Sequence, residues 1–422
     1  MSYLVWGLGR SGKACAELLK KKGYKVYAGD DKENPDLWKE VLSEVDTVVL
    51  SPGIPPRHPL WKEALKREKE VIGELELAYR FFKGKVIAIT GTDGKSTTTR
   101  LTYLILKKKF DKAYEGGNIG RPFSEILLES EEGIAVLEVS SFQGKTLKRF
   151  RPIVGAFISF AKDHLDWHPD EKDYLFSKYN IFKNQKESDT LILNDFVKEI
   201  RETPSRAKRI YYSSLKLKRE GIYFGDVKLF NPSLLKIRGI HNVYNAATAS
   251  LISLSMGLKP EEFEEILYSF EGLPHRLEYV GNINGVEVYN DSKSTTPHAL
   301  KAALLTFPDK SVILIVGGKD KGADFSEVSK IVKDKTKFVI AIGETKLKIK
   351  EAWKEITEVI TSESLEKAVK LAYALAKSGD IILFSPACSS FDMFRNYEER
   401  GQKFKELIKA LGKKESGLAA GE

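Results

Sequence analysis

The sequence predicts an α/β protein built from three domains, and three observations lead to this prediction. At 422 residues the chain is too long for one hydrophobic core, since domains commonly hold ~100 to 200 residues. Short apolar strands alternate with helical patterns, which is typical of parallel sheets made of βαβ units. Boundaries follow residues 82 and 272, so we expect domains at residues 1–82, 83–272 and 273–422.

The composition is that of a soluble globular protein and leaves its partners open. Hydrophobic residues make up 42% and charged residues 30% of the chain, the latter above the usual roughly 25%. The formal net charge of +9 suits nucleic acid, an acidic membrane surface or anionic small substrates. The longest basic runs, residues 20–22 and 107–109, fall where helices should end, and cations there favour the helix dipole. We therefore expect solvated helix ends and no nucleic-acid partner.

We expect neither a signal peptide nor a disulfide framework in this chain. No apolar run approaches the ~20 residues of a membrane span, and the first seven residues have the pattern of a strand instead of a signal peptide. Cys15 and Cys388 fall in different domains, so two unpaired thiols are expected. We predict a cytoplasmic monomer without a membrane span.

The first domain opens with strands at residues 3–7, 25–28 and 47–50. Gly7-Leu8-Gly9-Arg10-Ser11-Gly12 follows the first strand and opens a helix, the G-x-G-x-x-G arrangement of Rossmann-like domains. Asp30-Asp31 follows the second strand, where a ribose-binding acid belongs, and Ser51-Pro52-Gly53-Ile54 ends the third. The glycines alone suggest NAD. A nucleotide-sugar diphosphate fits a helix N-terminus equally well, and a structural tight turn is the remaining alternative.

A second glycine loop begins the central domain. The strand at residues 86–90 runs into Gly91-Thr92-Asp93-Gly94-Lys95-Ser96-Thr97, and a helix follows. In a phosphate-binding loop the glycines let backbone N–H groups approach phosphate oxygens, the lysine neutralises the β- and γ-phosphates, and the serine hydroxyl ligates Mg²⁺. Ile89 stands where the strict pattern has its first glycine, so this loop is a shorter variant. We predict a P-loop ATPase domain.

Cleavage of ATP needs further anionic groups that hold metal, and three later residues are candidates. Glu138 ends a strand, at the edge where parallel sheets place functional groups, although a solvated strand end has the same pattern. His164 follows the strand at residues 153–160, but a lone histidine is weak evidence. Lys178 has the pattern of an ordinary exposed helical lysine. A hairpin at residues 221–230 and two helices at 244–270 complete the domain.

The third domain follows a linker at Gly272-Leu273-Pro274. Strands at residues 286–290, 311–316, 337–342 and 380–384 alternate with helices, which predicts a second Rossmann-like domain. Residues 413–422 have the composition of a flexible tail.

Five motifs together resemble the Mur ligase family, and the resemblance spans nearly all of the chain. They are the phosphate loop, Gly116-Gly117-Asn118-Ile119-Gly120, Glu138-Val139-Ser140-Ser141, Asp163-His164-Leu165-Asp166 and His241-Asn242-Val243-Tyr244-Asn245. Members of this family build the peptide of bacterial peptidoglycan by joining amino acids to a UDP-linked muramic acid, with ATP and Mg²⁺. Folylpolyglutamate synthases are cousins, so the resemblance to the family alone leaves the substrate open.

Three further stretches resemble the family members that add D-glutamate to UDP-N-acetylmuramoyl-L-alanine. They are Ser51-Pro52-Gly53-Ile54, Gly272-Leu273-Pro274-His275-Arg276-Leu277-Glu278 and Asn290-Asp291-Ser292-Lys293-Ser294-Thr295. Sibling ligases generally have an Ala-His pair where this chain has Ser292-Lys293, and the Asp-Asn-Pro-Arg motif of the diaminopimelate-adding sibling is absent. Residues 385–392 resemble the family's C-terminal substrate loop. The resemblance therefore implies an ATP-dependent C–N ligase with these two small-molecule substrates.

The resemblance also implies roles at the ATP and metal sites. Lys95 would contact the phosphates and Ser96 a first Mg²⁺, while a second ion, with Mn²⁺ as a possible substitute, would be held by Glu138, His164 and Lys178. A lysine cation would be repelled by Mg²⁺, and in this family the matching lysine is carbamylated, which makes it an anionic ligand. The domains would close around ATP, whose remaining contacts would be Gly91, Thr92, Asp93, Gly94, Thr97, Asn245, Arg276 and Asp291.

The substrate contacts implied by the resemblance divide into two sets. The UDP-sugar would meet Leu8, Gly9, Arg10, Ser11, Asp31, Lys32, Gly53 and Asn118. A dicarboxylate requires cationic and hydroxyl groups, and the D-glutamate carboxylates would meet Lys293, Thr295, Lys321, Ser390 and Tyr397. Two positions depart from the family pattern: Asp93 replaces the usual asparagine, and Asp30-Asp31-Lys32 fits the uridine pattern only loosely.

The mechanism expected on this basis has two steps. The alanyl carboxylate attacks the γ-phosphate, because a free carboxylate has no usable leaving group, and the amine of D-glutamate then displaces phosphate from the acyl phosphate. The rival interpretations are a sibling or folate-type ligase, an NAD-dependent oxidoreductase, and a P-loop switch that binds partners without ligating anything.

Overall fold

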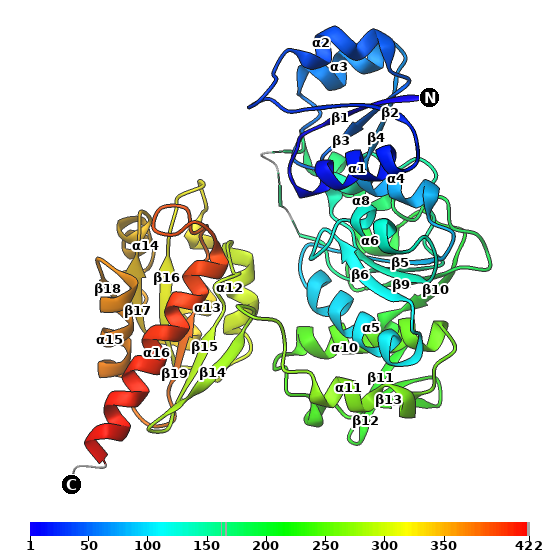
Figure 1. The fold of residues 1–422 in the computed structure, drawn as a ribbon. Coiled ribbons are helices and arrows are strands. Elements are labelled where there is room, and N and C mark those ends of the chain that lie inside the picture. Colours follow the sequence, from blue (N-terminus) through cyan, green and yellow to red (C-terminus); the bar gives the residue numbers. More distant parts are fainter. Residues whose placement is uncertain (162, 165–166, 420–422) are drawn as a thin grey trace. The chain divides into compact units, whose positions relative to one another are not determined.

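The computed structural model describes residues 1–161, 163–164 and 167–419. The chain forms two compact units (Figure 1). The first contains residues 1–235 and 243–269, and the second contains residues 236–242 and the chain from residue 270 onward.

The first unit begins with a four-stranded parallel sheet in the order β2-β1-β3-β4. Alternate residues of β1 point to opposite faces, so Leu4 and Trp6 pack in one core while Tyr3 and Val5 pack in another. The elements of this sheet and its helices are β1 (Ser2–Trp6), α1 (Arg10–Lys21), β2 (Lys25–Gly29), α2 (Leu37–Val41), η1 (Leu42–Glu44), β3 (Thr47–Leu50), α3 (Pro59–Lys66), β4 (Glu70–Gly73) and α4 (Glu74–Phe81).

A six-stranded parallel sheet follows, in the order β10-β9-β8-β5-β7-β6. The chain order reverses around β5, and parallel α/β sheets bind ligands at such a switch point. The elements are β5 (Lys85–Thr90), α5 (Lys95–Lys109), β6 (Ala113–Gly117), α6 (Phe123–Glu129), β7 (Ile134–Glu138), α7 (Ser141–Lys145), β8 (Val154–Phe157), α8 (Glu171–Tyr179), β9 (Thr190–Leu193), α9 (Lys198–Arg201) and β10 (Lys208–Tyr211).

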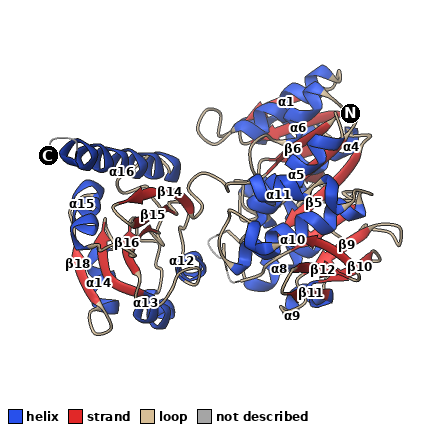
Figure 2. Ribbon diagram, turned by 90° about the horizontal axis from the view of Figure 1, so that it is seen from below, coloured by secondary structure: helices blue, strands red, loops and turns tan. Residues whose placement is uncertain are grey.

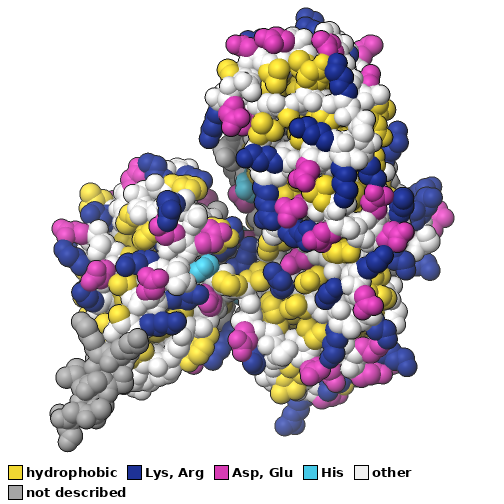
Figure 3. Space-filling model, in the orientation of Figure 1, with side chains coloured by type: hydrophobic (Ala, Val, Ile, Leu, Met, Phe, Trp, Pro, Cys, Tyr) yellow, Lys and Arg dark blue, Asp and Glu magenta, His cyan; other side chains and the backbone are white. Residues whose placement is uncertain are grey.

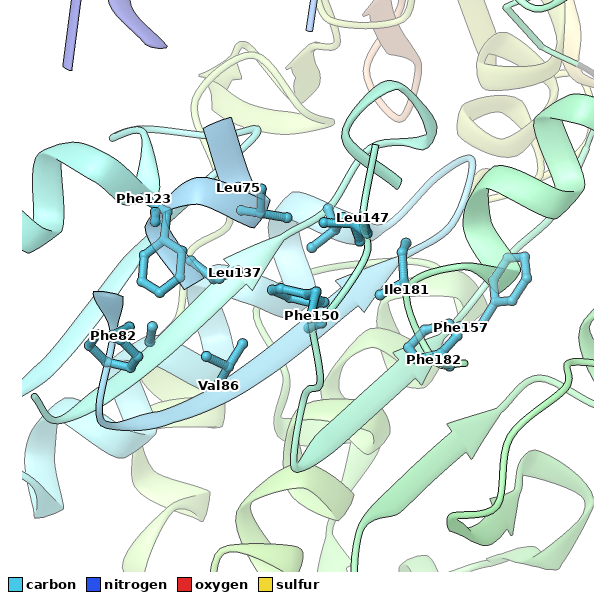
Figure 4. Packing of buried hydrophobic residues seen from close by; sticks show 14 of the residues in the cluster. Leu75, Phe82, Val86, Phe123, Leu137, Leu147, Phe150, Phe157, Ile181 and Phe182 are labelled. Atoms are coloured by element: carbon cyan, nitrogen blue, oxygen red, sulfur yellow. The ribbon is translucent and has the colours of Figure 1, made fainter. Parts of the chain in front are cut away.

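The two parallel sheets of the first unit share buried contacts. Leu75 of α4 lies in one hydrophobic cluster with Val86 and Leu137 of the second sheet (Figure 4). The carboxylate of Glu76, which is fully buried, accepts hydrogen bonds from the backbone N–H groups of residues 148–150. These contacts hold the first sheet against the second.

An antiparallel sheet completes the first unit. Its order is β11-β12-β13, and β12 and β13 form the hairpin expected at residues 221–230. The remaining elements of this region are η2 (Tyr212–Ser214), β11 (Leu215–Lys218), β12 (Gly221–Phe224), β13 (Val227–Phe230), η3 (Pro232–Leu234), α10 (Ile240–Ser255), η4 (Pro260–Glu262) and α11 (Glu264–Ser269).

The second unit is a six-stranded sheet in the order β14-β15-β19-β16-β17-β18, in which only the β14–β15 pair is antiparallel. Helices α12 to α14 pack on one face, and α15 and α16 pack on the other (Figure 2). The elements are β14 (Glu278–Ile283), β15 (Val286–Asn290), α12 (Pro297–Leu304), β16 (Val312–Gly317), η5 (Phe325–Val328), α13 (Ser329–Lys335), β17 (Thr336–Ile342), α14 (Lys346–Trp353), β18 (Glu358–Thr361), α15 (Leu365–Leu375), β19 (Ile381–Phe384) and α16 (Tyr397–Ala419).

The predicted α/β class is confirmed, whereas the secondary structure expected for the last residues is wrong. Residues 413–419 continue helix α16 instead of forming the expected flexible tail, and this stretch contains no proline that would stop the helix. Residues 420–422 of the expected tail lie outside the described residues. The two cysteines are unpaired, as expected, and the two long basic runs lie at the ends of α1 and α5. Lysine and arginine are interspersed with acidic side chains on the face in Figure 3. Within the described ranges, no helix has the length and apolar character that a membrane crossing requires.

Candidate functional site

The phosphate loop joins β5 to α5 at the carboxyl edge of the second sheet. Gly94 caps α5 with a φ of +80° and without a side-chain cap, so the first N–H groups of α5 point out of the helix as an anion site. A Cβ atom on Gly94 would lie 2.5 Å from Oδ1 of Asn245 on α10. Nζ of Lys95 donates to the carbonyl oxygens of Gly91 (2.9 Å) and Thr92 (2.7 Å). The loop therefore brings a cation and a helix N-terminus to one place.

The segment after β8 braces this loop from the other side. Oγ of Ser159 accepts from the backbone N–H of Asp93 (2.8 Å) and donates to the carbonyl oxygen of Asp93 (2.7 Å). The hydroxyl of Thr92 lies 3.0 Å from the hydroxyl of Tyr174 on α8. Neighbouring strand ends thus fix the loop conformation, which preorganises it for phosphate.

Glu138 at the end of β7 is buried beside the phosphate loop. Its side chain is 2% exposed, which excludes the solvated strand end that the sequence left open. The hydroxyl of Ser96 donates to Oε2 (2.5 Å), and Nδ2 of Asn118 donates to Oε1 (2.8 Å). Three residues predicted from different motifs are therefore in direct contact. Glu115, which the sequence did not single out, lies on the adjacent β6, and burial raises the pKa of its carboxyl.

Lys178 is the residue whose environment the sequence predicted wrongly. It was expected to be exposed, but the side chain on α8 is 1% exposed. Nζ donates to the carbonyl oxygen of Gly91 (2.8 Å) and lies 4.7 Å from the ring centre of Tyr174. Burial, followed by the charge of Lys95, lowers the pKa of Lys178 well below its usual value. Burial therefore disfavours the charged form of this amine, which lies against the phosphate loop.

His164 lies in the segment between β8 and α8 with a φ of +55°. Its ring packs 4.7 Å from the ring of Phe142 on α7, and Nε2 lies 3.4 Å from Oδ2 of Asp163. Leu165 and Asp166 of the same motif lie outside the described residues. Sequence reasoning missed His168, which is buried in the same segment between Asp173 and Ser141. The only signal for His168 in the sequence was its place four residues after His164.

The donor atoms of this region fit a magnesium site that is completed by nucleotide and water. No group of three or more His, Cys, Asp or Glu side chains within the described ranges forms a ready metal cage. Mg²⁺ prefers oxygen ligands, keeps several waters and is commonly held by one or two carboxylates together with phosphates. The adjacent oxygens of Ser96 and Glu138 match this preference.

The glycine loop of the first sheet, residues 7–12, follows β1 at the carboxyl edge of that sheet. Gly7 has a φ of +92°, and a Cβ atom on Gly12 would lie 1.9 Å from the carbonyl oxygen of Gly7, so both positions require glycine. Oγ of Ser51 donates to the same oxygen (2.5 Å), which brings the segment containing Gly53 beside the loop that carries Leu8, Gly9 and Ser11. Backbone approach to a diphosphate is thereby possible here.

Arg10 and Asp31 already have partners within the protein. The guanidinium of Arg10 donates twice to Glu125 and once to the carbonyl oxygen of Gly120. Asp31 accepts from Nε1 of Trp6 (3.1 Å) and lies 3.0 Å from Nε2 of His58. The exposed Lys32 donates its backbone N–H to Asp30.

In the second unit, three neighbouring strands bring most of the predicted amino-acid contacts to one edge. Asp291, Lys293 and Thr295 follow β15, Ser390 and Tyr397 follow β19, and Lys321 follows β16. Nζ of Lys293 lies 4.0 Å from the ring centre of Tyr397. The two carboxylate oxygens of Asp291 accept from the N–H of Leu277 (3.0 Å) and from Oγ of Ser385 (2.8 Å).

Ser390, Lys321 and Arg276 lie in loops near this edge of the sheet. Ser390 is 3% exposed, and Nζ of the exposed Lys321 lies 5.9 Å from the ring centre of Phe391. Arg276 lies in the turn before β14, where its N–H donates to the carbonyl oxygen of Leu273 (3.2 Å).

Sequence reasoning missed Arg400, which is fully buried behind this edge. Its guanidinium donates to Oγ (3.0 Å) and to the carbonyl oxygen (2.7 Å) of Ser292. Burial lowers the pKa of Arg400 to about 10. Its signal was hidden because its partner lies 108 residues away in the sequence.

Three family profiles match successive parts of the chain. They are described as Mur ligase MurD-like, N-terminal domain (residues 1–73), Mur ligase middle domain (residues 89–253) and Mur ligase, glutamate ligase domain (residues 275–388).

Curated relatives match over almost the whole length. The chain is 72% identical over 408 residues to UDP-N-acetylmuramoylalanine--D-glutamate ligase of Aquifex aeolicus, which covers 97% of this chain and 98% of that protein. It is 53% identical over 414 residues to the protein of the same name from Hydrogenobaculum sp., with coverage of 97% and 99%.

Solved structures agree in fold. A pseudomurein peptide ligase type C from Methanothermus fervidus aligns with a TM-score of 0.62 at 19% identity, covering 97% of this chain and 99% of that one. A MurF ligase from Thermotoga maritima in complex with ADP aligns with a TM-score of 0.62 at 21% identity, covering 87% and 97%.

Proposed function

The chain belongs to the Mur ligase family, and we propose that it joins D-glutamate to UDP-N-acetylmuramoyl-L-alanine while ATP is cleaved to ADP and phosphate. It is an ATP-dependent ligase of peptidoglycan precursor synthesis. The observation that carries the choice of amino acid is the 72% identity to a D-glutamate ligase over nearly the full length of both chains. The sheet edge that contains Lys95, Ser96 and Glu138 supports the use of ATP.

The first step makes the substrate carboxylate reactive. A carboxylate oxygen of the alanyl group attacks the γ-phosphorus, the bond to the β–γ bridging oxygen breaks, and ADP leaves. The acyl phosphate so formed has a good leaving group, which the free carboxylate lacks. The N-terminus of α5 and the ammonium of Lys95 stabilise the negative charge on the phosphoryl group during transfer.

The second step forms the amide. The neutral amine of D-glutamate attacks the acyl carbon, the tetrahedral intermediate expels inorganic phosphate, and the nitrogen loses one proton to the surrounding buffer or phosphate. The substrate contacts that we propose are the residues of the two loop edges. They are Leu8, Gly9, Arg10, Ser11, Asp31, Lys32, Gly53 and Asn118 for the UDP-sugar, and Lys293, Thr295, Lys321, Ser390 and Tyr397 for D-glutamate.

Metal ions would complete the ATP site. We assign a first Mg²⁺ to Ser96 and a second to Glu138, His164 and Lys178, with Mn²⁺ as a substitute. When bound, these ions would neutralise charge on the phosphates. The lowered pKa of Lys178 favours an unprotonated amine, which can attack CO₂ and lose a proton to give an anionic carbamate. We assign the remaining ATP contacts to the phosphate loop, Asn245, Arg276 and Asp291.

The product of the reaction tests this function. The protein is incubated with ATP, Mg²⁺ and UDP-N-acetylmuramoyl-L-alanine, and D-glutamate, L-glutamate, L-lysine or diaminopimelate is added in turn. We expect mass spectrometry to detect a nucleotide product that has gained one glutamyl residue with D-glutamate alone. Preference for another amino acid would contradict the proposed acceptor, and absence of any ligated product would contradict the ligase function.

A further inference from the structure

His168 forms a buried polar bridge that the proposed chemistry does not use. Its ring lies between two side chains, with Nδ1 2.7 Å from Oδ2 of Asp173 and Nε2 2.9 Å from Oγ of Ser141. An ionised carboxylate only accepts hydrogen bonds, so Nδ1 donates to Asp173 and Nε2 accepts from the hydroxyl of Ser141.

This bridge joins three segments, and each segment carries one of the residues assigned to the second metal ion. Ser141 begins α7, three residues after Glu138 at the end of β7. Asp173 lies on α8, five residues before Lys178. The backbone N–H of His168 itself donates to the carbonyl oxygen of His164 (2.9 Å). The ring of His168 thus links the segments that carry Glu138 and Lys178, and its backbone N–H contacts His164 directly.

The packing around the bridge leaves it little freedom. The ring of His168 lies 5.7 Å from the ring of Phe142 and 5.4 Å from the ring of Tyr174, between α7 and α8. Asp173 is also paired with the ammonium of Lys145 on α7. A side chain with both hydrogen bonds satisfied and fixed ring contacts restricts the segments that it joins.

The Ser141, His168 and Asp173 side chains also have the order of a nucleophile triad. A nucleophilic role would require a substrate to reach the hydroxyl, but Ser141 is 2% exposed and His168 is 1% exposed. The bridge is therefore suited to holding protein segments together.

We propose that His168 is a positioning residue that holds Glu138, His164 and Lys178 in the arrangement that binds the second metal ion. This inference rests on the proposed function, because the metal assignment does. Groups that orient metal ligands through hydrogen bonds commonly contribute 10- to 100-fold to metal affinity. Loss of the bridge should therefore weaken metal binding more than it weakens binding of the substrates.

The test compares four variants with the wild-type protein. His168→Phe keeps a ring and removes both hydrogen bonds, while Ser141→Ala removes one of them. His168→Asn keeps a donor for Asp173. Gln185→Met is the matched control, because Gln185 is fully buried in the same unit and donates to two backbone carbonyl oxygens, those of Pro152 and Thr190.

Binding of Mn²⁺ in the presence of ADP is measured by electron paramagnetic resonance, together with the Mg²⁺ concentration that gives half-maximal phosphate release. We expect the dissociation constant for Mn²⁺ and the half-maximal Mg²⁺ concentration to rise at least tenfold in His168→Phe and about threefold in Ser141→Ala. His168→Asn should recover part of the loss. Gln185→Met should lower the unfolding temperature and leave both constants within twofold of wild type.

Constants within twofold of wild type in His168→Phe would overturn the inference. If that variant does not fold, unchanged constants in Ser141→Ala would overturn it instead. An equal shift in Gln185→Met would also overturn it, because the effect would then be general destabilisation. A wild-type protein that binds Mn²⁺ but releases no phosphate with D-glutamate would contradict the proposed function, and the Mn²⁺ data would still test the role of His168.

Discussion

Replacement of Lys178 by methionine should separate its chemical role from its packing role. Methionine has nearly the same length and no charge, so it fits the buried position on α8. The carbonyl oxygen of Gly91 loses one donor, but Nζ of Lys95 still donates to it at 2.9 Å. The substitution therefore leaves no unpaired buried acceptor.

The expected magnitudes differ strongly between stability and activity. Loss of one hydrogen bond costs about 1 kcal/mol, and removal of a poorly solvated amine offsets a similar amount, so the free energy of unfolding should change by less than ~1 kcal/mol. Lys178 would act through the metal ion that neutralises the phosphates, and loss of such charge stabilisation costs roughly 10²–10³ in rate, or ~2.7–4 kcal/mol in activation free energy. Activity should therefore fall far more than stability.

The assay is D-glutamate-dependent phosphate release at saturating ATP and Mg²⁺, with thermal unfolding measured in parallel. Lys183→Met is the matched control, because Nζ of Lys183 also donates to a backbone carbonyl oxygen, that of Leu147 (3.0 Å), and burial also lowers the pKa of Lys183. The control should keep its rate within twofold. A Lys178→Met protein that works within threefold of wild type would refute the role assigned to Lys178, as would a loss of rate that only follows loss of fold.

Three more predictions concern other sites in the first unit. Lys95→Ala removes the cation of the phosphate loop, so phosphate release should fall to background in a coupled assay, and retained turnover would show that the loop does not hold the triphosphate. Gly94→Ala places a Cβ atom 2.5 Å from Oδ1 of Asn245. The φ of +80° at this position is a conformation that costs ~1–2 kcal/mol for other residues. The KM for ATP should therefore rise roughly tenfold, and an unchanged KM would contradict the tight fit. Burial raises the pKa of Glu74 from 4.5 to about 7. The protonated carboxyl therefore stabilises the folded state below pH 4.5, and up to ~3 kcal/mol of the free energy of unfolding is lost as the pH rises to about 7. Denaturant unfolding should show that Glu74→Gln becomes more stable relative to wild type as the pH rises through this window. Stability curves that stay parallel would be inconsistent with a buried, titrating carboxyl.

Local patterns were sufficient to predict the strand–loop–helix units and the residues at their ends. The glycine loops after β1 and β5 and the carboxylate of Glu138 at the end of β7 all lie at carboxyl edges, because a parallel sheet brings the ends of its strands together. The contact of Ser96 with Glu138 joins two motifs that the sequence had identified separately. The tail after residue 412 was predicted from composition, and its helical propensity was underestimated.

Environments created by distant contacts could not be predicted in this way. Lys178 is buried because α8 packs its side chain against the phosphate loop, and its carbonyl partner lies 87 residues earlier in the chain. Arg400 and its partner Ser292 are separated by 108 residues, and His168 depends on Ser141 at a separation of 27. Single-sequence periodicity carries no information about such pairs, so these polar residues had the pattern of ordinary surface positions.

Transfer of labelled oxygen tests the acyl-phosphate mechanism most directly. UDP-N-acetylmuramoyl-L-alanine is labelled with ¹⁸O in its alanyl carboxylate and is converted with ATP, Mg²⁺ and D-glutamate, and the released phosphate is analysed by mass spectrometry. Attack of the carboxylate on the γ-phosphorus predicts one ¹⁸O atom in each phosphate released, together with one glutamyl residue in each product. Unlabelled phosphate would mean that water attacks ATP, and it would contradict the assignment of this edge of the sheet to carboxylate activation.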